Sequence, residues 1–180
     1  MTTPPHNPFH LRLDNQIYWI TGSTFKRDHL LGDPEKGIWR EVLEETVKKM
    51  MLHLFAWVVL TNHYHLLVRL DRSSDLSVFA NQLNGRSSFQ INKLNGARGR
   101  KIWYQYWDRC IRGEEDFYVR FNYIHHNPVK HSIVPKTDDY EFSSYHYYLR
   151  KNGQEWIDDL WQAHPIVDFT PEDEEPFLKK

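Results

Sequence analysis

Two adjacent β-rich runs in the middle of the chain constrain its fold most. Residues 54–60 (LFAWVVL) and 63–70 (HYHLLVRL) are separated only by Thr61-Asn62. Two such runs joined by a short polar interruption are typical of an antiparallel hairpin. A sheet must form around this hairpin, and a chain of 180 residues can bury a core without disulfide or metal support. The single cysteine, Cys110, cannot form an internal disulfide, which predicts a reducing compartment.

The segments around the hairpin alternate between strand and helix patterns. Residues 17–24 (IYWITGST) and 102–111 (IWYQYWDRCI) are rich in aromatic and β-branched residues, so both are predicted strands. Apolar residues recur at helical spacing over residues 34–52 and again from residue 75 to Gly96, which predicts two helices.

A third helix is predicted to begin after Gly113 and to end near Asn127, because Pro128 disfavours the helical conformation in the residue before it. The order is then strand, helix, strand, strand, helix, strand, helix. This order predicts an α+β fold, a ferredoxin-like split β-α-β sheet of four antiparallel strands with an added C-terminal helix. In such a sheet the first and third strands are central, so residues 63–70 lie in the middle and residues 102–111 at an edge.

The ends of the chain differ from its centre. We expect residues 1–15 to form a flexible N-terminus, residues 16–150 to form one folded domain and residues 151–180 to form an acidic tail. The longest apolar run, residues 54–60, is far shorter than the roughly 20 residues that a membrane helix needs. We therefore expect a soluble cytoplasmic protein with no membrane partner. Within the tail, the Pro- and Glu-rich residues 165–176 are not expected to pack on the domain.

The net charge of −1 hides an uneven distribution. Residues 151–180 carry three lysines against eight acids, a net of −5, so the first 150 residues carry +4. The basic residues of the central stretch, and the candidates for binding a polyanion, are Arg86, Lys93, Arg98, Arg100, Lys101, Arg109 and Arg112. A solvated basic face is the alternative. The acidic tail could also lie in this basic region when no polyanion is bound.

The most informative histidines are His63 and His65, at the start of a predicted strand. Side chains alternate along a strand, so these two point to the same face while Tyr64 points to the other. Two imidazoles on one face can share a metal ion, although surface and hydrogen-bonded histidines are also common.

The third helix carries a polar row beside its apolar stripe. Phe117, Phe121 and Ile124 form the stripe, and the row, spaced three and four residues apart, consists of Arg120, Tyr123 and Asn127. The row is predicted to follow the seam between helix and sheet. Tyr123 is there either as a packing residue or as a functional hydroxyl.

A tyrosine is a weak nucleophile at neutral pH and needs a strongly polarised target. A divalent metal held by two histidines and a carboxamide oxygen would polarise a phosphate. Attack by Tyr123 would then form a phosphotyrosine link and release an alcohol without a nucleotide cofactor. Such a link keeps the energy of the phosphodiester, so a strand could be rejoined.

Three blocks resemble the signature blocks of the single-tyrosine HUH transposases, in the same order. They are residues 60–67 (LTNHYHLL), 107–112 (WDRCIR) and 123–130 (YIHHNPVK). The last block, with residues 139–145 (DYEFSSY) after it, is most similar to the branch of REP-associated tyrosine transposases. The resemblance covers roughly residues 16–150.

The resemblance implies an enzyme that recognises imperfect DNA hairpins and cleaves and joins single strands beside them with Mg²⁺ or Mn²⁺. His63 and His65 match the metal ligands and Tyr123 matches the nucleophile. Asn127 stands where related enzymes have a glutamine ligand. The implied setting is the bacterial cytoplasm, associated with the nucleoid, as a monomer or a homodimer. Arg120 would lie near the scissile phosphate or pair with Asp116.

In this reading the basic, aromatic stretch 86–112 holds phosphates and stacks on unpaired bases. Strand alternation separates Trp103, Gln105, Trp107 and Arg109 from Tyr104 and Tyr106, so about half of these aromatic residues belong to the core. Two other functions remain open: a module that binds structured nucleic acid without cutting it, and a small histidine-based metallohydrolase.

Overall fold

The computed structural model describes residues 13–169. Most of the predicted flexible N-terminus and the last part of the acidic tail lie outside these residues. Four strands form one antiparallel sheet: β1 (Gln16–Thr24), β2 (His53–Val59), β3 (His63–Leu70) and β4 (Trp103–Cys110). Their order is β2-β3-β1-β4, so β1 and β3 are central and β4 is an edge strand, as predicted.

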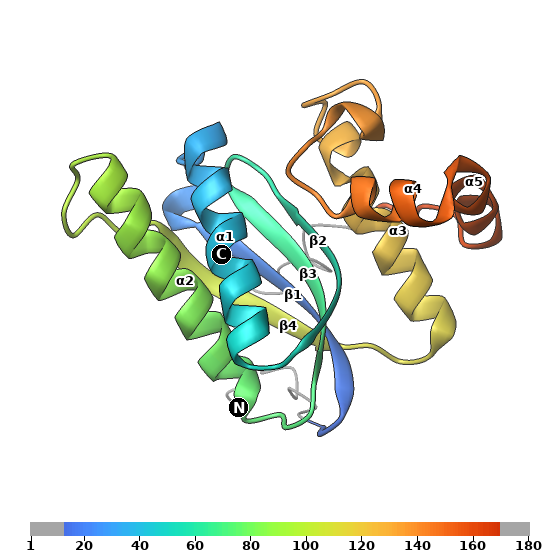
Figure 1. The fold of residues 1–180 in the computed structure, drawn as a ribbon, viewed down its shortest axis with the longest axis horizontal. Helices are drawn as coiled ribbons and strands as arrows, with labels where there is room; N and C mark the ends of the chain where they lie inside the picture. Colours follow the sequence, from blue (N-terminus) through green and yellow to red (C-terminus); the bar gives the residue numbers. More distant parts are fainter. Residues whose placement is uncertain (1–12, 170–180) are drawn as a thin grey trace, which may run out of the picture.

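Helices cover both faces of the sheet (Figure 1). The helices α1 (Asp33–Lys49) and α2 (Asp75–Leu94) lie on one face, and α3 (Glu114–Lys130) lies on the other. Outside α3 follow the short helices η2 (Thr137–Asp139), α4 (Tyr145–Asn152) and α5 (Gln154–Ala163). This is the predicted α+β fold with its added helix. Among the described residues, no helix is long and apolar enough to cross a membrane.

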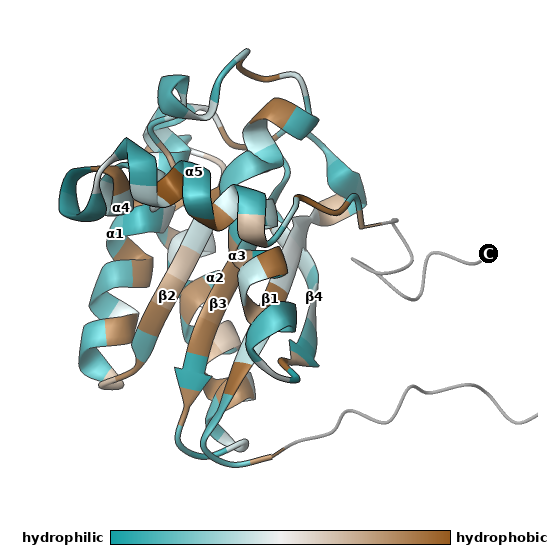
Figure 2. Cartoon of the chain, turned by 90° about the vertical axis from the view of Figure 1, so that its right-hand side faces the viewer, coloured by the Kyte–Doolittle hydropathy of each residue, from teal (hydrophilic) through white to brown (hydrophobic). Residues whose placement is uncertain are grey.

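Each face of the sheet has its own apolar core. Side chains such as Tyr18, Ile20 and Leu66 pack under α1 and α2. The alternate side chains of the same strands, Trp19 and Leu67, pack under α3. Because β1 and β3 are buried on both faces, their period of two decides which residues reach the α3 face. Figure 2 looks onto that face, with β4 at its right-hand edge.

The predicted end of the third helix at Asn127 is wrong, because α3 continues through Pro128 to Lys130. A proline here removes one amide donor, and it does so close to the end of the helix, where the cost is small. The amide of His131 donates to the carbonyl of Asn127 at 3.0 Å, so the backbone pattern resumes beyond the proline. The added turn brings Lys130 onto the same side of the helix as Tyr123.

An irregularity in β4 breaks the predicted alternation of its side chains. Gly22 pairs with Tyr106 but Thr24 pairs with Trp103, so β4 holds one extra residue opposite Ser23. Trp103 therefore packs on the same side as Tyr106, against the core under α1 and α2. A bulge is a feature of the pairing between two strands, so it cannot be recognised from the side-chain alternation of one strand.

Candidate active site

His63 and His65 project from the start of β3 toward α3. A neighbouring side chain forms a hydrogen bond with Nδ1 of each ring. Nδ1 of His63 donates to the side-chain amide oxygen Oδ1 of Asn62 at 2.7 Å. The hydroxyl of Thr21, which faces His65 across the β1–β3 pairing, lies 2.8 Å from Nδ1 of His65. In the tautomer that carries a proton on each Nδ1, both Nε2 atoms have free lone pairs. A metal-binding histidine requires this tautomer and this kind of support.

The two Nε2 atoms and the amide of Asn127 lie close together. Nε2 of His63 is 3.2 Å from Oδ1 of Asn127, near the end of α3. Nε2 of His65 is buried and has no hydrogen-bond partner among the described residues, and the same is true of Nδ2 of Asn127. Buried polar atoms are rarely left without partners, so this cluster is suited to a ligand that supplies the missing interactions.

Burial keeps both imidazoles neutral. It lowers the pKa of His65 well below 6.5, and the nearby positive charge of His63 when protonated acts in the same direction. Burial, followed by the charge of His131, also lowers the pKa of His63. Neutral imidazoles are the form that binds metal ions.

These residues fit a divalent cation. Ligand atoms in neighbouring positions of an octahedral ion lie about 3 Å apart when the bonds are about 2.1 Å long, and His63 and Asn127 have this spacing. The donor set of two imidazoles and one amide oxygen contains no carboxylate. Accordingly, the described residues contain no group of three histidines, cysteines or acids that could hold a metal.

Tyr123 lies beside this cluster and is fully buried. Its ring centre is 5.5 Å from that of His65 and 6.1 Å from that of Trp19. Arg120 and Asn127, the other members of the predicted polar row, are also buried. The row therefore follows the seam between helix and sheet as predicted, and α3 is buried over a wider sector than its apolar stripe alone indicates.

Comparison with known proteins identifies the family of this chain. The family model described as "Transposase IS200 like" matches residues 13–127, which is well over half of the chain and includes His63, His65, Tyr123 and Asn127. The chain belongs to the IS200-like transposase family. As a member of that family it is an enzyme of DNA cleavage and transfer.

Two relatives narrow the class. The REP-associated tyrosine transposase of Escherichia coli K12 is 28% identical over 139 residues, which are 72% of this chain and 80% of that protein. A Haemophilus influenzae Rd protein named as a candidate member of the same class is 30% identical over 118 residues, 60% of this chain and 67% of that protein. The resemblance to this branch is thereby confirmed.

A solved structure shares the fold of the transposase. It is described as a REP-associated tyrosine transposase bound to a REP hairpin, and it matches with a TM-score of 0.71. The match covers 94% of this chain and 96% of that one, at 22% sequence identity. This likeness confirms the predicted ferredoxin-like architecture.

Lys130 of the transposase contacts the phenol of Tyr123. Nζ of Lys130 donates to the tyrosine oxygen at 2.8 Å and lies 4.6 Å from the ring centre. Burial lowers the pKa of Lys130, and the carboxylate of Asp168 opposes this shift. The amine therefore loses its proton more readily than a lysine in water.

Phe169 packs over the same tyrosine, contrary to the prediction that residues 165–176 do not pack on the domain; residues 170–176 lie outside the described residues. The ring centre of Phe169 lies 4.9 Å from that of Tyr123 and 5.3 Å from that of Trp19. The guanidinium of Arg120 lies over both rings, 4.4 Å from the ring centre of Phe169 and 4.2 Å from that of Trp19. Arg120 also pairs with Asp116 at 2.9 Å. The contacts of this one aromatic ring thus hold the segment against the domain, although the tail as a whole is acidic.

A pocket of about 310 Å³ opens beside His63. Arg27, His29 and His131 line it, and no acidic side chain is among the described residues that do so. The ring centre of His131 lies 4.9 Å from that of His63. A pocket with basic walls and no carboxylate suits a phosphate group.

The predicted DNA-binding residues do not form one surface. Arg86 pairs with Glu45 of α1 on the opposite face of the sheet, and Arg100 contacts Asn92. Arg120 is buried beside Tyr123. The remaining predicted residues are exposed around β4 and the end of α2, namely Lys93, Arg98, Lys101, Arg109 and Arg112.

Sequence reasoning missed four side chains of the site. Thr21 and Asn62 contact the Nδ1 atoms of the histidines, and Thr21 could be found only from the strand register. Lys130 lies seven residues after Tyr123, a two-turn spacing that would have indicated it had the helix been extended past Pro128. Phe169 carried no sequence signal, because its contacts are long-range.

Proposed function

We propose that this transposase cleaves and rejoins single-stranded DNA beside hairpins through a phosphotyrosine intermediate at Tyr123. The observation that carries the proposal is the convergence of three metal-ligand atoms, from His63, His65 and Asn127, beside a tyrosine held by a lysine. All of these side chains belong to one chain. A single copy can therefore supply the whole site.

The proposed roles follow from the contacts. His63, His65 and Asn127 would hold Mg²⁺ or Mn²⁺ through Nε2 atoms and an amide oxygen. The bound ion would polarise the scissile phosphate as a Lewis acid and orient it. Asn62 and Thr21 keep the two imidazoles in the tautomer that this binding needs.

In the cleavage step the oxygen of Tyr123 forms a bond to phosphorus, and the bond from phosphorus to the leaving oxygen breaks. The phenol loses one proton in this step, and the leaving oxygen gains one, so the strand end leaves as an alcohol. Lys130 fixes the phenolic oxygen and favours its negative charge during the attack. The reverse reaction rejoins a strand, so no nucleotide cofactor is required.

We propose a hairpin of single-stranded DNA as the partner. A REP hairpin is bound by the protein of the matched structure, and the relatives are named as REP-associated. The exposed basic residues around β4 would contact the phosphates of such DNA.

The proposal is tested with single-stranded hairpins from the flanks of the protein's own gene and Mn²⁺ or Mg²⁺. The expected result is a covalent protein–DNA adduct that is lost in Tyr123→Phe and in His63→Ala. Tyr118→Phe, on the same helix, is the matched control and should keep the adduct. Cleavage that survives Tyr123→Phe but is lost in His63→Ala would favour the metallohydrolase alternative and contradict the proposal.

A further inference from the structure

An aromatic and basic cluster lies near the pocket, where β1 ends and β4 begins. The helix η1 (Phe25–Arg27) follows β1 directly, and the loop after α2 leads into β4. These segments come together at one end of the sheet (Figure 1). The amide of Phe25 donates to the carbonyl of Ile102 at 2.7 Å, which fixes one segment to the other.

An exposed ring of this cluster lies beside a half-buried ring and an ammonium group. The ring centres of Phe25 and Tyr104 are 6.1 Å apart, and Tyr104 is 51% exposed. Nζ of Lys101 lies 5.0 Å from the first ring centre and 4.8 Å from the second. Nζ of Lys26 lies 5.5 Å from the ring centre of Phe25. Proteins that bind single-stranded nucleic acid commonly use aromatic faces flanked by cations. The rings stack on the bases and the cations contact the phosphates.

The backbone beneath the rings is strained. Lys26 and Arg27 both have φ near 57°, the left-handed region that residues with side chains rarely adopt. The side chain of Thr24 donates to the carbonyl of Asp28 at 2.7 Å and holds this turn. Strain kept in place by such bonds is found most often at functional sites.

The cluster is continuous with the candidate active site. Asn62 donates from its amide to the carbonyl of Arg27 at 3.2 Å, and its oxygen accepts from Nδ1 of His63. Arg27 also lines the pocket beside His63. A strand lying over Phe25 and Tyr104 would therefore lead into that pocket.

We infer that Phe25, Tyr104, Lys26, Arg27 and Lys101 form a stacking platform for unpaired bases of the DNA strand that runs between the hairpin and the pocket. The inference rests on the proposed function, because it names how the same site holds its substrate. A base displaces the ammonium of Lys101 from the exposed ring of Tyr104, and the ammonium then pairs with a neighbouring phosphate. The platform reads no base edge, so it tolerates different sequences.

The test measures DNA binding in a Tyr123→Phe background, where no cleavage occurs. One probe is a hairpin from the flank of the protein's gene with its single-stranded extensions, and the other is the same hairpin with blunt ends. Tyr104→Ala should weaken binding of the extended probe roughly tenfold and leave the blunt probe unchanged, because one stacking contact is lost. Tyr104→Phe keeps the ring and should restore the binding.

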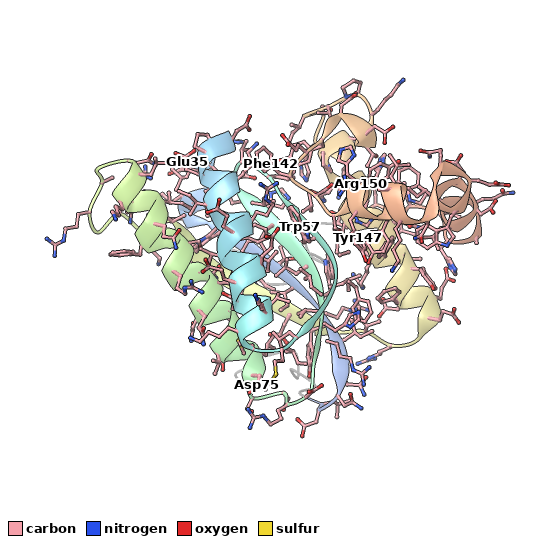
Figure 3. The ribbon with its side chains drawn as sticks, in the orientation of Figure 1. Glu35, Trp57, Asp75, Phe142, Tyr147 and Arg150 are labelled. Carbon is pink, nitrogen blue, oxygen red and sulfur yellow. The ribbon has the colours of Figure 1, made fainter. Side chains whose placement is uncertain are left out.

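Tyr147→Ala is the matched control. Tyr147 is also 51% exposed and also has a lysine, Lys151, over its ring at 5.5 Å. It lies on α4, far from the loop after α2 (Figure 3). Its replacement should change the binding of neither probe.

Equal affinities of Tyr104→Ala and Tyr147→Ala for the extended probe would overturn the inference. An equal loss of affinity of Tyr104→Ala for both probes would also overturn it, because the cluster would then contact the stem of the hairpin. The outcome is independent of the adduct experiment. A missing adduct together with a loss specific to the extended probe would reject the proposed chemistry and keep the platform.

Discussion

Nζ of Lys130 lies 2.8 Å from the phenolic oxygen of Tyr123, two helical turns earlier on α3. This contact exists because α3 passes through Pro128 instead of stopping before it. Lys130 also donates to the carbonyl of Phe169 at 3.1 Å, so one amine contacts both the proposed nucleophile and the tail.

Replacement of Lys130 by methionine should slow adduct formation by about ten- to a hundredfold, because a charged donor to the developing phenolate is lost. Lys130→Arg should recover part of the rate, since it keeps a donor. The measurement is the single-turnover rate at saturating DNA. A rate that is unchanged in Lys130→Met would show that the contact has no catalytic role.

Replacement of Thr21 by valine keeps the shape of the side chain but removes the hydroxyl beside Nδ1 of His65. Affinity for Mn²⁺ should fall by roughly ten- to a hundredfold, as is usual when the partner of a metal-binding histidine is lost. Calorimetric titration of the DNA-free protein with Mn²⁺ measures this directly. Thr21→Ser should bind nearly as the parent does, and Ser23→Ala, in the same pocket wall, serves as the control. Equal affinity in Thr21→Val would contradict the assigned role.

Phe169→Ala should expose Tyr123 to substrate. The ring of Phe169 covers the tyrosine, so its loss should raise the adduct rate severalfold at low DNA concentration. The loss of this half-buried ring should also cost about 1–2 kcal/mol of folding stability. Val167→Ala, in the same segment but exposed, should change neither quantity. A slower reaction in Phe169→Ala would instead assign the ring to the substrate-binding wall.

Folding stability should fall in acid partly because of His125. Burial lowers the pKa of His125 to about 3, while an unfolded histidine titrates near 6.5. Between these values the unfolded chain binds a proton that the folded chain does not, so stability decreases as the pH falls from about 6.5 toward 3. Replacement of His125 by glutamine should reduce the stability difference between pH 7 and pH 5 by about 2 kcal/mol.

Urea unfolding in metal-free buffer measures this difference. His53→Gln, at an exposed position at the start of β2, is the control and should keep the full pH dependence. If His125→Gln lost as much stability in acid as the parent, the histidine would not be the source of the effect.

The sequence predicted those parts of the fold that depend on local period and element order. The hairpin of β2 and β3 followed from two β-rich runs around Thr61-Asn62, and the order of the elements was enough to place β3 at the centre of the sheet. The alternation of β3 likewise placed His63 and His65 on one face. The polar row of α3 followed from its helical spacing.

The parts that were missed depend on contacts between distant segments. The position of Thr21 opposite His65 requires the register of two strands, and Phe169 reaches Tyr123 across 46 positions of sequence. The bulge in β4 moved Trp103 to the other face, which no single-strand period predicts. Pro128 predicts a helix end, but a helix tolerates a proline where only one bond is lost near its end.

The central claim is that Tyr123 becomes joined to DNA, and peptide mapping of the adduct tests it most directly. The protein is incubated with Mn²⁺ and the extended hairpin, the DNA is digested, and mass spectrometry locates the residual nucleotide. We expect the nucleotide on the peptide that contains Tyr123, attached to the phenolic oxygen. A nucleotide on another residue, or cleaved DNA without any attached nucleotide, would contradict the account.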